Sequence, residues 1–300
     1  MSTKVVSMTE GKIWKKLLLF SIPLMMGSFF QQLYNTADSI IVGNYVGKEA
    51  LAAIGTTDNL INTFIGFFMG LSTGAGIIIS QYFGAKDEKN VQIAVNTTIG
   101  LTFVMSVICT VCALGFRTKM LKLMNTPAEV FVQADAYLRI YFLGGKIVRV
   151  GLPMALQSAV VSFSNVFVQS YINHFDVAAM AGWLAYGKVD KFCLLPIQSL
   201  SLGLMTFVGQ NYGAKRYDRI RKGIRTGLTM CFGIAICMII LINLFAESLV
   251  SMFIQSPDVV KFGTLFIHIE MPFYLALCVN SVYDSTLRGI GMTKGPMLIM

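Results

Sequence analysis

Polar side chains near the end of the first apolar stretch have the spacing of a cation-binding face. Gln31 precedes Tyr34 by three residues, and Asn35 precedes Asp38 by three. Residues three or four positions apart are neighbours on a helix, so these side chains share one face. An aspartate at the centre of a membrane helix costs about 2.5–3.5 kcal/mol, and an ionisable residue there usually has a function. We therefore predict that Asp38 binds a cation or a proton, with the other three side chains beside it.

A bland alternative exists for each of these residues. Asp38 comes late in its apolar stretch, where water near the far membrane surface would also accommodate it. Gln31, Tyr34 and Asn35 have the chemistry of polar contacts between neighbouring helices. The interpretation of Asp38 as a coupling site has a physical basis, because burial favours the neutral carboxyl group and a bound cation favours the charged one. A proton and a cation would then exclude one another at Asp38.

A second group of polar residues lies in the apolar stretch over residues 182–208. Asp190 stands between Lys188 and Lys191, and Gln198 follows two residues after Pro196. One interpretation is a local Asp–Lys pair near the outer membrane surface. The other is that Asp190 and Gln198 line a cavity, where the carboxylate attracts cationic compounds.

The elements that carry these residues are predicted to be membrane-spanning helices. The 300 residues are 55% hydrophobic and only 13% charged, which is about half the charge density of a soluble domain. Apolar runs of twenty residues recur, and only helices satisfy their own backbone groups in such runs. The fold class is therefore an all-α polytopic membrane protein.

The charges predict the orientation of these helices. The net charge is +9, and the basic residues concentrate in the breaks between apolar runs, most densely over residues 215–225. This distribution follows the positive-inside rule and places both termini in the cytoplasm. Orientation accounts for the basic residues, so we expect no nucleic-acid partner. Near the end of the chain, Asp284 is expected to pair with Arg288 four residues later.

The two halves of the chain repeat one another. Gln210–Lys215 repeats the pattern of Gln81–Lys86, and Gln255–Pro257 repeats that of Asn125–Pro127. This predicts two tandem repeats of about four helices each, over residues 1–145 and 146–300, with a seam near Gly144–Lys146. Internal repeats are common in secondary transporters, where the binding sites lie near the repeat interface. No nucleophile–base pair or metal-ligand spacing is present, so we expect neither an enzyme nor a metal or cofactor site.

These motifs resemble the MATE (multidrug and toxic compound extrusion) family. The matching stretches are Ser21–Pro23 leading to Asp38, Ala50–Gly55, Gln81–Lys86, Gly151–Pro153, Val208–Ala214 and Leu287–Gly289. The resemblance implies two lobes around a central cavity in the bacterial inner (plasma) membrane. It also implies efflux of cationic or amphipathic organic compounds in antiport with protons or sodium. Asp38 matches the carboxylate of the family's first helix, where the coupling ion is placed.

The chain departs from this family pattern in length. It lacks part of the fourth helix, helices five and six, and helices eleven and twelve of the family scheme. The family places polar partners of the first-helix carboxylate on helices five and six. Two alternatives therefore stay open besides a multidrug antiporter. One is a transport-incompetent chain or half of an assembly, completed by self-association or by a second chain, and the other is a flippase for lipid-linked precursors.

Overall fold

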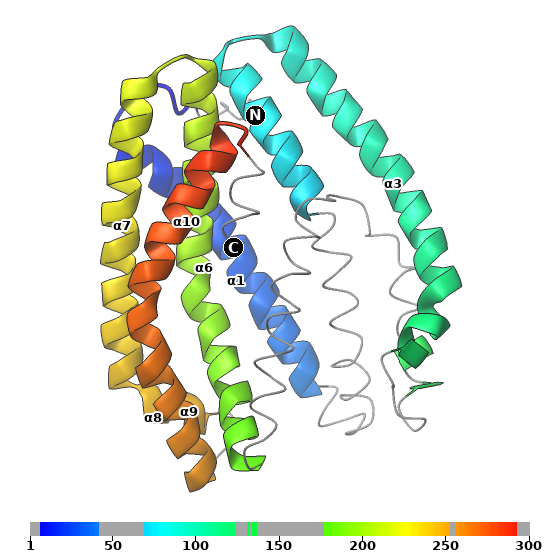
Figure 1. The fold of residues 1–300 in the computed structure, drawn as a ribbon, viewed down its shortest axis with the longest axis vertical. Coiled ribbons are helices and arrows are strands. Elements are labelled where there is room, and N and C mark those ends of the chain that lie inside the picture. Colours follow the sequence, from blue (N-terminus) through cyan, green and yellow to red (C-terminus); the bar gives the residue numbers. More distant parts are fainter. Residues whose placement is uncertain are drawn as a thin grey trace. The chain divides into compact units, whose positions relative to one another are not determined.

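Helices and short turns make up the described part of the molecule. The computed structural model describes residues 7–41, 69–123, 131–132, 134–136, 177–252 and 256–292, and no strand occurs among them. Four helical stretches in these ranges are long and apolar enough to cross a membrane, as predicted from the apolar runs (Figure 1).

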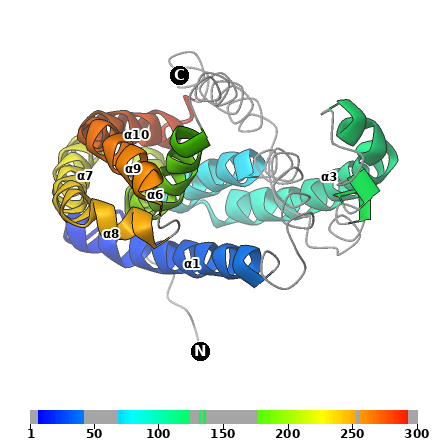
Figure 2. The same cartoon turned by 90° about the horizontal axis from the view of Figure 1, so that it is seen from below.

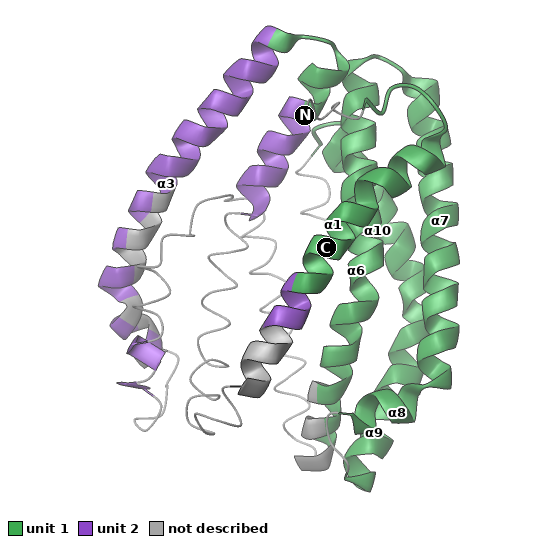
Figure 3. Cartoon of the chain, turned by 180° about the vertical axis from the view of Figure 1, so that it is seen from behind, with its two compact units in different colours: residues 1–30, 80–88, 162–300 green, residues 31–79, 89–161 purple. Residues whose placement is uncertain are grey.

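Contacts along the chain define two compact units. Unit 1 contains residues 1–30, 80–88 and 162–300, and unit 2 contains residues 31–79 and 89–161 (Figure 3). These boundaries differ from the division at residue 145, because the first thirty residues and the turn at 80–88 pack with the second half of the chain.

Unit 1 is built around one long helix, α6, which packs against α7, α9 and α10 (Figure 1, Figure 2). The first part of α1 also lies in this unit. The helices are α1 (Ile13–Ile41), α6 (Val177–Gly213), α7 (Tyr217–Leu244), α8 (Ala246–Ser251), α9 (Pro257–Glu270), the 3₁₀ turn η2 (Met271–Phe273) and α10 (Tyr274–Gly289).

Small residues let α6 approach its neighbours closely. On α7, a Cβ at Gly227 would meet a methyl carbon of Leu204 at 3.0 Å, and Gly223 lies directly against the ring of Phe207. A Cβ at Gly182 of α6 would come within 2.8 Å of the backbone nitrogen of Gly263 on α9. Both Leu204 and Phe207 are fully buried. Close contact of this kind replaces the hydrophobic driving force that helices lack in lipid.

Unit 2 contains most of a helix over residues 69–84 and most of α3 (Glu88–Leu123). α3 continues as one helix to Leu123, so the basic residues after Phe116 lie on this helix. Thr118 near this end donates a hydrogen bond to Asp135, at 3.1 Å.

Candidate functional site

The four predicted cation-site residues belong to one uninterrupted helix. α1 runs from Ile13 to Ile41 with Pro23 inside it, so residues 31, 34, 35 and 38 share a face as predicted. Gln31 is exposed, and Tyr34 is 70% exposed. The side chains of Asn35 and Asp38 lie outside the described residues, so the proposed role of Asp38 stays a prediction.

Asp190 is held by two tyrosines. On α6 itself, the hydroxyl of Tyr186 donates to Asp190 Oδ1 at 3.4 Å. From the first residue of α10, the hydroxyl of Tyr274 donates to the same oxygen. Both tyrosines are buried, whereas Asp190 is half-buried. Packed rings adjoin this group, since the Trp183 ring lies 5.2 Å from that of Tyr186.

The described residues show no Asp–Lys ion pair in this region. Lys188 and Lys191 are both exposed, and neither forms an ion pair with Asp190 in the described part of the chain. On a helix these lysines lie about 200° and 100° around the axis from Asp190, so they point elsewhere. Gln198 is also exposed, and among the described residues no hydrogen bond joins it to Asp190. A shared cavity for Asp190 and Gln198 stays a prediction.

The repeated motifs form two turns of the same geometry. In the first, the N–H groups of Ala85 and Lys86 bond to the carbonyls of Gln81 and Phe83. In the second, Ala214 and Lys215 bond to Gln210 and Tyr212 in the same pattern. Each turn ends on a lysine in the left-handed region, with φ of 59° at Lys86 and 57° at Lys215. The sequence repeat is thus a repeat of backbone structure.

The two turns contact each other reciprocally through their glycines. A Cβ at Gly84 would overlap the carbonyl oxygen of Gln210 and lie 2.7 Å from its Cα. A Cβ at Gly213 would overlap the carbonyl oxygen of Gln81 and lie 2.9 Å from its Cα. Both are backbone contacts that a Cβ atom would not fit. We call this reciprocal contact the turn joint. It joins the first repeat to the second at the basic ends of their helices.

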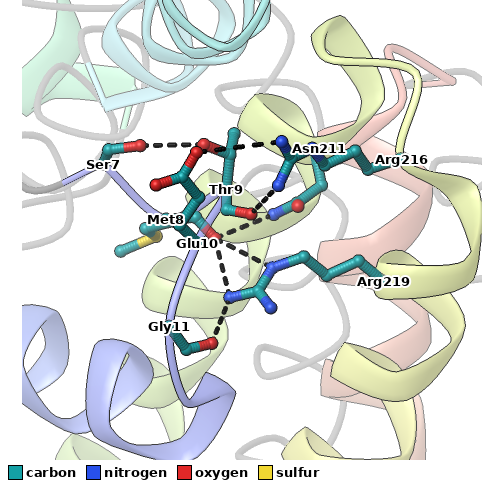
Figure 4. Close-up of polar contacts among 8 residues, drawn as sticks. All are labelled: Ser7, Met8, Thr9, Glu10, Gly11, Asn211, Arg216 and Arg219. Atoms are coloured by element: carbon teal, nitrogen blue, oxygen red, sulfur yellow. Dashed lines mark hydrogen bonds and ion pairs between the residues drawn. The ribbon is translucent and has the colours of Figure 1, made fainter.

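A segment near the N-terminus, residues 7–11, makes polar contacts with Asn211, Arg216 and Arg219 (Figure 4). The N–H of Met8 donates to Gln210 Oε1 at 2.7 Å, and its carbonyl accepts from Asn211 Nδ2 at 3.2 Å. Arg219 on α7 donates to the same carbonyl through Nε and Nη2, both at 3.3 Å, and to the carbonyl of Gly11 at 2.7 Å. The Met8 side chain is fully buried.

A second arginine binds the same segment. Arg216 Nη1 donates to the carbonyl of Thr9 at 2.7 Å, and Nη2 lies 3.8 Å from the carboxylate of Glu10 (Figure 4). Two members of the basic cluster over residues 215–225 therefore hold backbone carbonyls. No feature of the sequence analysis predicted this contact.

The predicted pair at the end of α10 is confirmed. Arg288 Nε lies 2.9 Å from Asp284 Oδ2, and both side chains are largely buried. One residue on, the carbonyl of Gly289 accepts a hydrogen bond from Gln81 Nε2 at 2.9 Å. The end of α10 is thereby tied to the first of the two turns.

Comparison with known proteins identifies the family. The MatE family model matches the chain twice, over residues 23–148 and 153–300. The chain belongs to the MatE family. The model matches once in each half of the chain, and the predicted resemblance is confirmed. Members of this family are transporters, so the expectation that the chain is not an enzyme is also confirmed.

Named relatives and solved structures agree with this assignment. The probable multidrug resistance protein YoeA of Bacillus subtilis (strain 168) is 22% identical over 390 residues, which cover 97% of this chain and 84% of that protein. The probable multidrug resistance protein NorM of Thermotoga maritima is 27% identical over 154 residues, covering 51% of this chain and 33% of that protein. An outward-facing multidrug resistance MATE family transporter superposes with a TM-score of 0.88 at 18% identity, covering 100% of this chain and 87% of that one.

These matches establish the fold as that of a multi-pass membrane transporter of the MATE type. The alignment with the Bacillus protein runs over 390 residues, whereas this chain has 300. The chain is therefore shorter than that relative within the matched region, as expected from the missing helices.

Proposed function

We propose that this chain exports cationic or amphipathic organic compounds across the bacterial inner membrane in antiport with protons or sodium, with both termini in the cytoplasm. The observation that carries the proposal is the turn joint, in which Gly84 and Gly213 bring together the ends of two repeats of a transporter family. An exchanger must close one side of the membrane while the other is open. A tight contact between the repeats at the basic end supports a closed cytoplasmic side, by the positive-inside rule.

Asp38 supplies the exchange in this proposal. Its carboxyl group takes either a proton or a cation, and binding of one excludes the other. Gln31, Tyr34 and Asn35 share its helix face, and exposed Gln31 and Tyr34 are accessible to a ligand. Asp190 and Gln198 are proposed as further cavity-lining residues on α6.

Dye efflux from proteoliposomes tests this proposal. Purified protein is reconstituted, a fluorescent organic cation is loaded, and a proton or sodium gradient is applied in separate arms. We expect gradient-driven export, with Asp38→Asn abolishing its dependence on the gradient. Asp258→Asn, an exposed carboxylate in the first turn of α9, is the matched control. Equal gradient dependence in wild type and Asp38→Asn would overturn the coupling role.

One observation favours a second candidate, an assembly of two chains. The chain has 300 residues where its Bacillus relative is aligned over 390, so a second copy or a complementing chain could complete the site. Mass measurement of the protein in lipid nanodiscs, combined with efflux per reconstituted molecule, separates the two. Transport only by dimers would favour the assembly. Transport of lipid-linked precursors without export of organic cations would favour the flippase.

A further inference from the structure

Four side chains at the basic end of α6 and α7 hold the N-terminal segment and form one binding surface. We call this surface the peptide seat, and its members are Gln210, Asn211, Arg216 and Arg219. Every member bonds to a main-chain group of residues 8–11, and the two arginines supply most of the donors (Figure 4). Main-chain groups are the same in nearly every residue, so this surface has the chemistry of a peptide-binding site.

One buried side chain anchors the segment in the peptide seat. Met8 is fully buried and Thr9 is largely buried, whereas Glu10 and Gly11 are exposed. Methionine is unbranched and flexible, so it fills irregular apolar gaps well. In peptide recognition, main-chain hydrogen bonds supply affinity and the pocket of an anchoring side chain supplies selectivity. The segment offers both.

The segment can leave the seat without unfolding the helices around it. Residues 7–11 belong to no helix, and the hydrogen bonds that attach them run to side chains of α6 and α7. At the base of the seat, Asn211 Oδ1 is buried and accepts no hydrogen bond among the described residues. An unsatisfied acceptor lowers the stability of the seated state. Short segments with few buried contacts are the parts of proteins that open locally.

The peptide seat is continuous with the turn joint through Gln210. The side chain of Gln210 accepts from the N–H of Met8 at 2.7 Å, and its own carbonyl oxygen is the atom against which Gly84 packs. The next residue, Asn211, donates to the Met8 carbonyl at 3.2 Å. A movement of the second turn away from the first therefore displaces two members of the seat.

The segment is also attached to the start of α1. Gly11 has a φ of 81°, in the left-handed region, and this bend leads directly into α1 at Ile13. On α1, Leu17 is fully buried, and Ser21 lies against Gly203 of α6. α1 carries the beginning of the first family match, whereas α6 and α7 lie in the second. The seated segment thus fastens the first repeat to the second at the basic end.

We propose that residues 7–11 are a latch, and that their binding in the peptide seat holds the turn joint closed. With Met8 in the seat, the second turn is held in its contact with the first. When the segment leaves, that turn loses a contact and the joint opens more often. The purpose of the latch rests on the proposed function, because an exchanger must open and close this side in every cycle. The binding itself is independent of what is transported.

A thiol placed inside the joint reports its opening. Ser80 is 5% exposed, and a Cβ at Gly209 of α6 would overlap its Oγ. The thiol introduced by Ser80→Cys should therefore react with a maleimide chiefly while the turns are apart. The reaction is followed in nanodiscs without substrate or gradient. Mass spectrometry of the peptide that contains residue 80 distinguishes this thiol from the native cysteines.

Variants of the anchor and of the seat should change the labelling rate in the Ser80→Cys background. Met8→Ser removes the apolar anchor and should accelerate labelling roughly 10-fold or more. Met8→Leu conserves the apolar volume and should stay within about twofold of the unchanged anchor. Arg219→Ala should also accelerate labelling, because it removes the donors to the Met8 and Gly11 carbonyls. This variant keeps the latch testable if Met8→Ser fails to fold.

A peptide added in solution tests the seat directly. The probe has the sequence of residues 7–11 with blocked ends, and it is added to the full chain that carries Met8→Ser. At millimolar concentration it should slow the labelling again, since a short flexible tether corresponds to an effective concentration in that range. The same peptide with serine in place of methionine should have no effect.

Three outcomes would overturn the latch. They are a labelling rate that neither Met8→Ser nor Arg219→Ala changes, a Met8→Leu chain labelled as fast as Met8→Ser, and a probe peptide that does not slow labelling. Asp38→Asn separates this inference from the proposed function. The effect of Met8→Ser on labelling should persist in that variant, whether or not the protein transports.

Discussion

The turn joint predicts that one methyl group will separate the two repeats. In Gly84→Ala, the added Cβ would overlap the carbonyl oxygen of Gln210 and lie 2.7 Å from its Cα, whereas real Cβ atoms keep at least 3.0 Å from such neighbours. The atoms in the way are backbone, so the turn itself must move. Overpacking of this kind costs about 1–3 kcal/mol. The closed joint should then lose roughly 5- to 150-fold in population relative to an open one.

The same helices provide matched controls. Gly76 lies on the helix of Gly84, and Gly187 lies on the helix of Gly213, and a Cβ at either would meet nothing within 4 Å. Gly76→Ala and Gly187→Ala should therefore leave thermal stability unchanged or slightly raised, since alanine favours helix. Gly84→Ala and Gly213→Ala should each lower the midpoint of thermal unfolding in detergent by several degrees.

A double-variant cycle sharpens this test. Gly84 and Gly213 contribute to one joint, so once either alanine has opened it, the second should add little. We expect the loss in Gly84→Ala/Gly213→Ala to fall at least 0.5 kcal/mol short of the sum of the single losses. Additive losses, or a Gly84→Ala protein as stable as Gly76→Ala, would refute the reciprocal contact as described.

Further expectations concern the N-terminal segment and the end of α10. Arg219→Ala removes the donors to the Met8 and Gly11 carbonyls, which should cost about 1.5–3 kcal/mol of binding of this segment. A protease should then cut near residue 8 faster than in wild type, by a factor of roughly 10 or more. Lys222 is an exposed neighbour, so Lys222→Ala should be cut at the wild-type rate. Asp284→Asn leaves the buried Arg288 without its carboxylate partner and should lower the free energy of unfolding by about 3 kcal/mol. Denaturant titration measures this loss, with Asp258→Asn as the control. Equal stability of the two variants would contradict the buried pair.

Contacts between residues close in sequence were predictable, and contacts between distant residues were not. The Asp284–Arg288 pair follows from the spacing of neighbours on a helix, and the structure confirms it. Tyr186 stands four residues before Asp190, so the same rule would have found it. Tyr274 lies 84 residues from Asp190, and no local pattern indicates their contact.

The N-terminal segment shows the same limit in another form. Its backbone carbonyls at Met8 and Gly11 are the groups that Arg219 binds. Every residue carries a carbonyl, so no residue type announces this role. The basic cluster predicted the orientation in the membrane, but whether an arginine faces headgroups or a peptide segment depends on how α7 packs.

The two glutamines of the turn joint, Gln81 and Gln210, form hydrogen bonds with different partners. Gln81 uses its amide nitrogen to donate to the carbonyl of Gly289, whereas Gln210 uses its amide oxygen to accept from the N–H of Met8. Glutamine can do both, since its side chain carries a donor and an acceptor. When the turns separate, the Gln81–Gly289 and Gln210–Met8 hydrogen bonds must either break or move together with the turns. Removal of either contact should ease opening, and the arginines that hold the Met8 segment make the N-terminal contact the stronger of the two.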